Sequence, residues 1–181
     1  LGMQHRAGPK SQIPIIGIDY FYITRGGVKT RSELECLDNA EGEAQILQER
    51  QNGRLIKCII IRDTQSKNVF CHVIPCKGDD EDHQTANMAA DDIKWMGYTK
   101  LILKSDNEAA LKALERRIRF LLGQTGQEIV QASEEESAAY ESQSNGGTEV
   151  GIRNVRGLLR TLKLCTEARI EKYIPVDHPL I

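Results

Sequence analysis

Three acidic residues stand at positions where solvation alone does not explain a carboxylate. Asp19 lies in the middle of the apolar run IPIIGIDYFYI at residues 13–23. A carboxylate in a buried strand is costly unless it is paired, hydrogen-bonded or bound to a cation. Asp106 follows the segment LILKS, and Glu149 opens a helical pattern after a glycine-rich turn. We therefore expect these three acids to meet in space and to hold divalent metal.

Carboxylate oxygens are the ligands that Mg²⁺ prefers. Two such ions about 3.5–4 Å apart can activate a water or hydroxyl group and stabilise the leaving oxygen of a phosphoryl transfer. In this arrangement Asp19 bridges two Mg²⁺ or Mn²⁺ ions, and Asp106 and Glu149 each complete one. Each acid also has a structural explanation: Asp106 as a helix N-cap, Glu149 as a partner of the helix dipole, and Asp19 in a buried salt bridge.

Glu149 begins a helical pattern that also carries a stripe of positive charge. At 100° per residue, four cations fall within about 40° of Glu149: Arg153, Arg156, Arg160 and Lys163. Arginine and lysine leading away from an acidic site suit a phosphate backbone that runs past that site. The alternative is a solvated charged face of an amphipathic helix.

The composition is that of one globular domain. Of 181 residues, 40% are hydrophobic and 28% charged, and the net charge of −2 does not by itself indicate a nucleic-acid binder. The five scattered cysteines favour a reducing, intracellular setting. Apolar runs are too short to span a membrane. We expect residues 1–12 to be a linker and 13–181 to be a single domain, cut from something longer, because the sequence begins without methionine and stops without a terminal signal.

The apolar periodicity predicts an α/β fold with a five-stranded mixed sheet flanked by helices. The predicted strands are 13–23, 55–61, 69–75, 100–104 and 129–132, and the first three form an antiparallel meander. The predicted helices are 79–95, 108–122 and 148–168. Residues 24–53 read as an acidic solvated insertion, and 133–147 as a mobile loop.

Three segments together resemble a known family. IDYFYI, LILKSDNEAAL and QSNGGTEVGIRNVRGLLRTLK are similar to the catalytic core of retroviral and retrotransposon integrases, especially those encoded by retrotransposon polyproteins. These enzymes belong to the DDE group with a ribonuclease H-like fold. The resemblance covers about residues 13–181. It aligns Asp19, Asp106 and Glu149 with the three acids of the family.

The resemblance implies a polynucleotidyl transferase and endonuclease. Such an enzyme trims element DNA ends and joins the 3′ hydroxyl to target DNA with Mg²⁺ or Mn²⁺. It implies a homodimer or larger assembly on double-stranded DNA, and a nuclear location. Asn145 and Gly146 correspond to the flexible loop before the glutamate, and Arg153, Arg156 and Arg160 to the helix that faces DNA. Glu108 departs from the family, which often has glycine there.

Two other functions stay open. The chain could be a non-catalytic DNA-binding or assembly module from a decayed or domesticated element, or a ribonuclease H-like nuclease acting on RNA–DNA hybrids. A zinc site at Cys71, His72, Cys76 and His83 is disfavoured, because neighbouring strand residues point to opposite faces. We expect Asp63 to serve a tight turn.

Overall fold

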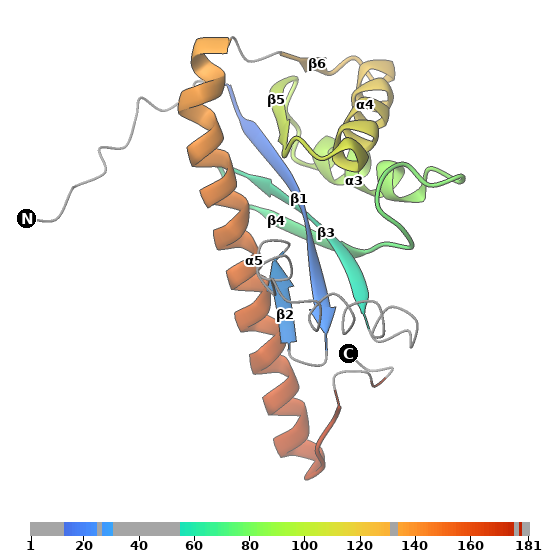
Figure 1. Cartoon of the computed structure of the whole chain (residues 1–181), viewed down its shortest axis with the longest axis vertical. Helices are drawn as coiled ribbons and strands as arrows, with labels where there is room; N and C mark the ends of the chain where they lie inside the picture. Colours follow the sequence, from blue (N-terminus) through green and yellow to red (C-terminus); the bar gives the residue numbers. More distant parts are fainter. Residues whose placement is uncertain (1–12, 25–26, 31–54, 131–133, 176–177, 179–181) are drawn as a thin grey trace, which may run out of the picture.

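A computed structural model describes residues 13–24, 27–30, 55–130, 134–175 and 178 (Figure 1). The strands are β1 (Ile15–Thr24), β2 (Gly27–Thr30), β3 (Ile56–Asp63), β4 (Val69–Val73), β5 (Lys100–Ser105) and β6 (Glu128–Ile129). The helices are α3 (Gln84–Trp95), α4 (Ala109–Gln124) and α5 (Glu134–Ile170). The predicted linker at 1–12 and most of the predicted insertion lie outside the described residues.

The sheet is open and mixed, with strand order β4-β3-β1-β5-β6. β1, β3 and β4 form the predicted antiparallel meander. β5 runs parallel to β1, and β6 runs parallel to β5. In the described part of the chain the sheet has six strands instead of the predicted five, because Gly27–Thr30 pairs antiparallel with the end of β1.

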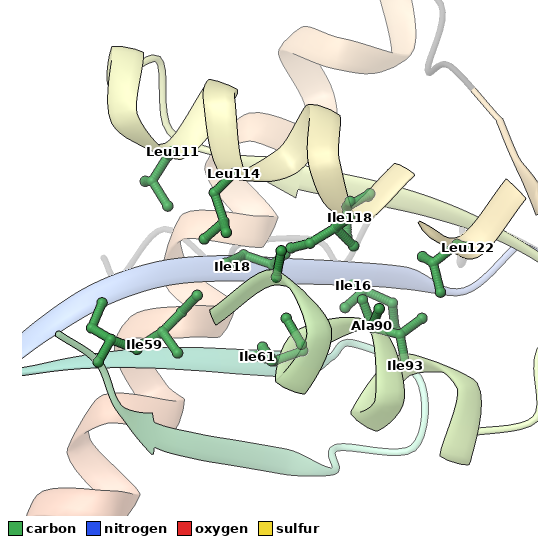
Figure 2. Close-up of a cluster of buried hydrophobic side chains, with 14 of the residues drawn as sticks. Ile16, Ile18, Ile59, Ile61, Ala90, Ile93, Leu111, Leu114, Ile118 and Leu122 are labelled. Atoms are coloured by element: carbon green, nitrogen blue, oxygen red, sulfur yellow. The ribbon is translucent and has the colours of Figure 1, made fainter. Parts of the chain in front are cut away.

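One face of the sheet packs against α3 and α4 and holds the larger core (Figure 2). Strand side chains such as Ile16, Ile18, Ile59 and Ile61 meet an apolar helix stripe there. On α4 the buried positions 111, 114, 118 and 122 recur every three or four residues, as expected for a helix with one apolar face. This periodicity explains why α3 and α4 lie on the sheet where they do.

The opposite face is covered by α5, which lies on the other side of the sheet from α3 and α4 (Figure 1). Its contacts form a smaller core in which Ile152 packs with Phe21, Ile23 and Ile60. Side chains alternate along a strand. β1 therefore presents Ile18 and Tyr20 to α3 and α4, and Asp19 and Phe21 to α5.

The predicted loop at 133–147 was wrong, since α5 begins at Glu134 and includes Asn145 and Gly146. The segment from Glu134 to Ser144 contains four glutamates and two alanines, which favour helix. Its first glutamates also complement the positive end of the helix dipole. A glycine pair costs only about 1 kcal/mol per residue in a helix interior, so it does not interrupt α5.

Helix α3, predicted at 79–95, starts later than predicted, at Gln84 instead of residue 79. Asp80 accepts hydrogen bonds from the backbone N–H groups of Gln84 (2.8 Å) and Thr85 (3.0 Å). A side-chain acceptor for the first N–H groups defines a helix start. His83 also has a positive φ of 54°, which is outside the helical region.

Candidate metal and nucleic-acid site

Asp19 and Asp106 are brought side by side by the parallel pairing of β1 and β5. The last pair of that ladder is Ile18 with Ser105. Asp19 follows Ile18 in β1, and Asp106 follows Ser105 directly after β5. The sheet thus places two of the three predicted acids at neighbouring positions, at the carboxyl end of β5.

Asp19 also lies at an interruption in the pairing of β1. β3 pairs with β1 from Ile16 to Ile23, so β5 and β2 must share the other edge of β1. On that edge β5 pairs with residues 15–18 and β2 with residues 21–24. Among the described residues the two ladders are separated by Asp19 and Tyr20, and this gap in strand pairing is an opening beside the first predicted acid.

The Asp19 carboxylate is half-buried and accepts a hydrogen bond from the Tyr20 N–H, with Oδ1 2.7 Å from the nitrogen. This bond lies at the interruption in the ladder. It supplies an acceptor for a backbone donor that strands otherwise satisfy by pairing. The carboxylate is therefore held close to the sheet edge on the α5 face.

Glu149 is exposed on α5, on the side of the helix nearest this opening. Thr148, Ile152, Val155 and Leu159 are buried or half-buried and form a stripe centred about 90° from Glu149. Gly147 and Gly151 lie about 90° to the other side of that stripe and face Ile60 and Arg62 of β3. Glu149 therefore lies on the flank turned away from β3, toward the edge of β1 that carries the opening.

Among the described residues, no three or more His, Cys, Asp or Glu side chains are grouped so that they could hold a metal ion. Asp19 and Asp106 each follow the last pair of the β1–β5 ladder, and Glu149 lies on α5. Of the residues considered for zinc, His72 instead contacts Asp92, with Nε2 2.5 Å from Oδ2. His83 Nδ1 lies 2.8 Å from Asp79 Oδ1.

A buried acid that the sequence analysis missed holds the end of β5. The Ser105 hydroxyl donates to Glu115 Oε2 at 2.5 Å, and Arg119 Nη2 lies 2.6 Å from Glu115 Oε1. Arg119 also donates to the carbonyl oxygen of Leu103 at 3.1 Å. Burial raises the pKa of Glu115, but these hydrogen bonds and the charges of Arg119 and Lys112 outweigh it, so the net pKa is below its usual range. The cluster fixes the residue that precedes Asp106.

The unusual Glu108 is neutralised by a lysine. Lys77 Nζ lies 2.7 Å from Glu108 Oε1, and both side chains are largely buried. The same ammonium lies 5.4 Å from the centre of the Tyr20 ring and 5.7 Å from that of Tyr22, a cation–π arrangement. Since even-numbered β1 residues face α3 and α4, this ion pair lies on the face opposite Asp19. Glu108 therefore does not add charge beside the predicted metal ligands.

The predicted basic stripe is only partly available to a ligand. Arg153 and Arg160 are exposed, and Arg156 is half-buried. Lys163 is tied to its own helix and to the segment that follows it, with Nζ 2.5 Å from Glu167 Oε1 and 4.4 Å from the Tyr173 ring centre. Gly146 is exposed in α5. The side chain of Asn145 lies outside what the structure describes.

Asp63 serves a turn, as predicted, and is completely buried. It accepts hydrogen bonds from the backbone of Gln65 and Ser66 and from the Tyr98 hydroxyl, at 2.8, 2.9 and 2.6 Å. Burial raises its pKa, but these hydrogen bonds prevail and the net pKa is lowered. It is thus engaged structurally.

Glu115, Lys77 and Arg62 were all missed as partly or fully buried charges. The sequence did carry a signal for Glu115. It lies on the same helix face as the apolar residues at 111, 114, 118 and 122, where a solvated side chain is not expected. Arg62 similarly ends the apolar run CIII of β3.

Comparisons with protein-family models, curated proteins and solved structures gave no match. No helix in the described part of the chain is long and apolar enough to cross a membrane.

Proposed function

We propose that this chain is the catalytic core of a retroelement integrase with a ribonuclease H-like fold. The observation that carries the proposal is the register that sets Asp106 beside Asp19 at an opening in the sheet. The mixed sheet, with a meander followed by parallel β5 and β6, is the α/β arrangement that the sequence resemblance implies.

The donor chemistry of the three acids fits divalent metal. Asp19 and Asp106 offer adjacent carboxylates, and α5 carries Glu149 on the flank nearest to them. Carboxylate oxygens are hard ligands suited to Mg²⁺ or Mn²⁺. When bound, a metal pair supplies activation of the attacking oxygen and stabilisation of the leaving oxygen. The proposed role of the three side chains is to hold and orient that charge without a protein general base.

Arg153 and Arg160 would hold DNA, because they lie exposed on the flank of α5 that carries Glu149. Guanidinium groups bind phosphate with paired hydrogen bonds. The duplex would then pass along α5 and bring one phosphodiester to Asp19 and Asp106. The proposed reaction trims element ends and joins a 3′ hydroxyl to target DNA, in the nucleus.

The test measures joining of a 3′-hydroxyl DNA end to a second duplex in Mg²⁺ and in Mn²⁺. Asp19→Asn, Asp106→Asn and Glu149→Gln are expected to lower the rate at least about 10²-fold with unchanged circular dichroism. Asp91→Asn is the matched control, because Asp91 is an exposed acid on α3. Joining by any of the three variants at the parent rate would reject the assignment. Cleavage of RNA–DNA hybrid in preference to duplex DNA would favour the nuclease alternative.

A non-catalytic assembly module is the second candidate, and one observation favours it. In its C-terminal half, α5 exposes Leu158 and Leu162, which lie one turn apart and are 61% and 55% exposed. Exposed large apolar residues that follow one another along a helix are typical of contact surfaces. Dimerisation together with DNA binding in chelator, and no joining with either metal, would support this candidate. The same surface could serve the homodimer expected of an integrase.

A further inference from the structure

Gly151 lies where α5 packs tightly against the sheet. A Cβ atom at this position would lie 2.9 Å from Ile60 Cδ1, 3.1 Å from Arg62 Cδ and 3.8 Å from Val69 Cγ2. Real Cβ atoms essentially never approach a neighbour within 3.0 Å. Even alanine would therefore require Ile60 to change its conformation or α5 to move. The absence of a side chain at Gly151 thus lets the Ile60 and Arg62 side chains of β3 pack directly against α5.

Arg62 extends this contact along one helical turn. Its Cδ lies by Gly151, and its Nη1 would be 3.6 Å from a Cβ at Gly147. The side chain therefore runs beneath the turn that carries Glu149. Arg62 is only 9% exposed, and its Nε has no hydrogen-bond partner in the described part of the chain. Contact with α5 covers this charged side chain and limits how far the turn can shift without exposing it.

Ile60 connects the same contact to the first predicted acid. Ile60 is the β3 partner of Asp19 in the antiparallel ladder. Glu149 precedes Gly151 by two residues and belongs to the same turn. The turn of α5 that carries Glu149 therefore packs, through Gly151, on Ile60, and Ile60 is the residue paired with Asp19.

We propose that Gly151 is a positioning residue that fixes Glu149 relative to Asp19 through its contact with Ile60 and Arg62. The catalytic consequence rests on the proposed integrase function. The geometric consequence does not, because it concerns only the separation of two named residues. Gly151 itself has no proposed contact with DNA or metal.

The test is a set of four variants: Gly151→Ala, Ile60→Val, the double variant, and Gly157→Ala. Ile60→Val deletes Cδ1, the atom nearest to the added methyl group. Gly157 is the matched control, because it lies in the same helix with nothing within 4 Å of an added Cβ. Crystal structures would give the Cα–Cα separation of Asp19 and Glu149, and DNA joining in Mn²⁺ would give kcat and KM.

Gly151→Ala is expected to change that separation and to lower kcat, by up to about 10²-fold for a displacement near 1 Å, while KM for DNA stays within about twofold. The double variant is expected to regain the parent separation and kcat. Ile60→Val and Gly157→Ala are expected to match the parent in both. A purely structural role would lower the melting temperature without this selective loss and recovery of kcat.

An unchanged separation in Gly151→Ala would overturn the proposal, and so would a changed separation with parent kcat. If the parent does not join DNA but Gly151→Ala still displaces Glu149, the integrase assignment fails while the positional inference stands. Should Gly151→Ala not fold, Ile60→Leu tests the same contact, since it redirects the terminal methyl groups at nearly constant volume. It is expected to displace Glu149 and lower kcat, and parent values in both readouts would overturn the proposal.

Discussion

Ile18 and Ser105 form the last pair of the parallel ladder between β1 and β5. Asp19 and Asp106 follow them, so this one pairing determines whether the two acids meet. Ser105 does not rely on the ladder alone, because its hydroxyl donates to buried Glu115. The geometry of the candidate site therefore depends on a carboxylate that does not belong to it.

Glu115→Gln is expected to destabilise the fold by about 1–3 kcal/mol, the cost of weakening buried hydrogen bonds to a charged group. Glu115 is 6% exposed and bonds both Ser105 and Arg119. Urea unfolding would measure the loss. Asp91→Asn is the control, since Asp91 is 75% exposed beside Lys94 and should change stability by less than about 1 kcal/mol. Equal effects of the two variants would contradict the role given to Glu115.

The same residue predicts a pH dependence. The folded-state pKa of Glu115 is lowered from its ordinary value of 4.5, so the unfolded chain binds the proton more tightly. Its contribution to stability is therefore complete above the unfolded pKa and is lost as pH falls through the folded pKa. As the pH is lowered from 7, the unfolding free energy should decrease once the pH is below about 4.5. Glu115→Gln should flatten this dependence of the unfolding free energy on pH. An unchanged slope in the variant would assign it to other carboxylates.

Glu108→Gln tests the ion pair with Lys77. Both partners are largely buried, so removing the carboxylate should cost about 1.5–3 kcal/mol. The matched control is Glu128→Gln, because Glu128 is 66% exposed and pairs with exposed Lys100 at 3.1 Å; its loss should be below about 1 kcal/mol. Thermal unfolding of the two variants measures the difference. Joining activity should persist in Glu108→Gln, since this pair faces away from Asp19.

Tyr98→Phe removes the hydroxyl that donates a hydrogen bond to buried Asp63 at 2.6 Å. The expected cost is about 1.5–3 kcal/mol, because the lost bond serves a charged group. The pKa of Asp63 should rise, so acid unfolding should begin at a higher pH than in the parent. Tyr173→Phe is the control, since Tyr173 is 76% exposed. An acid transition at the parent pH would contradict the proposed interaction.

The sequence was sufficient where one pattern dominated. The β-branched runs at β1 and β3 predicted strands, and the structure buries both on two faces. Asp19 within one apolar run and Asp106 directly after another were predicted to meet, and the register of β1 and β5 brings these two positions to neighbouring places in the sheet. By contrast, β2 is only four residues long and contains one buried apolar side chain, Val28, so composition alone could not distinguish it from a turn.

Other features depend on contacts between distant residues. Gly146 and Gly147 signal a turn locally, but α5 continues through them. Glycine at position 151 likewise lowers the helix propensity of its segment. The reason for a glycine there is its contact with Ile60 of β3, which the sequence does not reveal. The pairing of Glu108 with Lys77 joins residues 31 positions apart. No periodicity predicts such partners, because they are chosen by the packing of whole elements.

Salt dependence of DNA binding tests the basic stripe. Arg153→Gln and Arg160→Gln should each lower affinity and reduce the slope of log K against log salt by about 0.9, the contribution of one phosphate contact. Both side chains are exposed on the flank that carries Glu149. Lys163→Gln should change the slope little, because Glu167 and the Tyr173 ring already engage its ammonium. Fluorescence anisotropy in chelator would isolate binding from catalysis.

Arg169→Gln is the charge-matched control for this experiment. Arg169 is exposed on the same helix, but it falls about 160° or more around the axis from Arg153 and Arg160. If DNA follows the stripe, its loss should leave the slope unchanged. If the Arg169 and Arg153 variants instead weaken binding equally, the attraction is a general effect of net charge. DNA would then have no preferred path past Asp19 and Asp106, and the proposed orientation of the phosphodiester would be wrong.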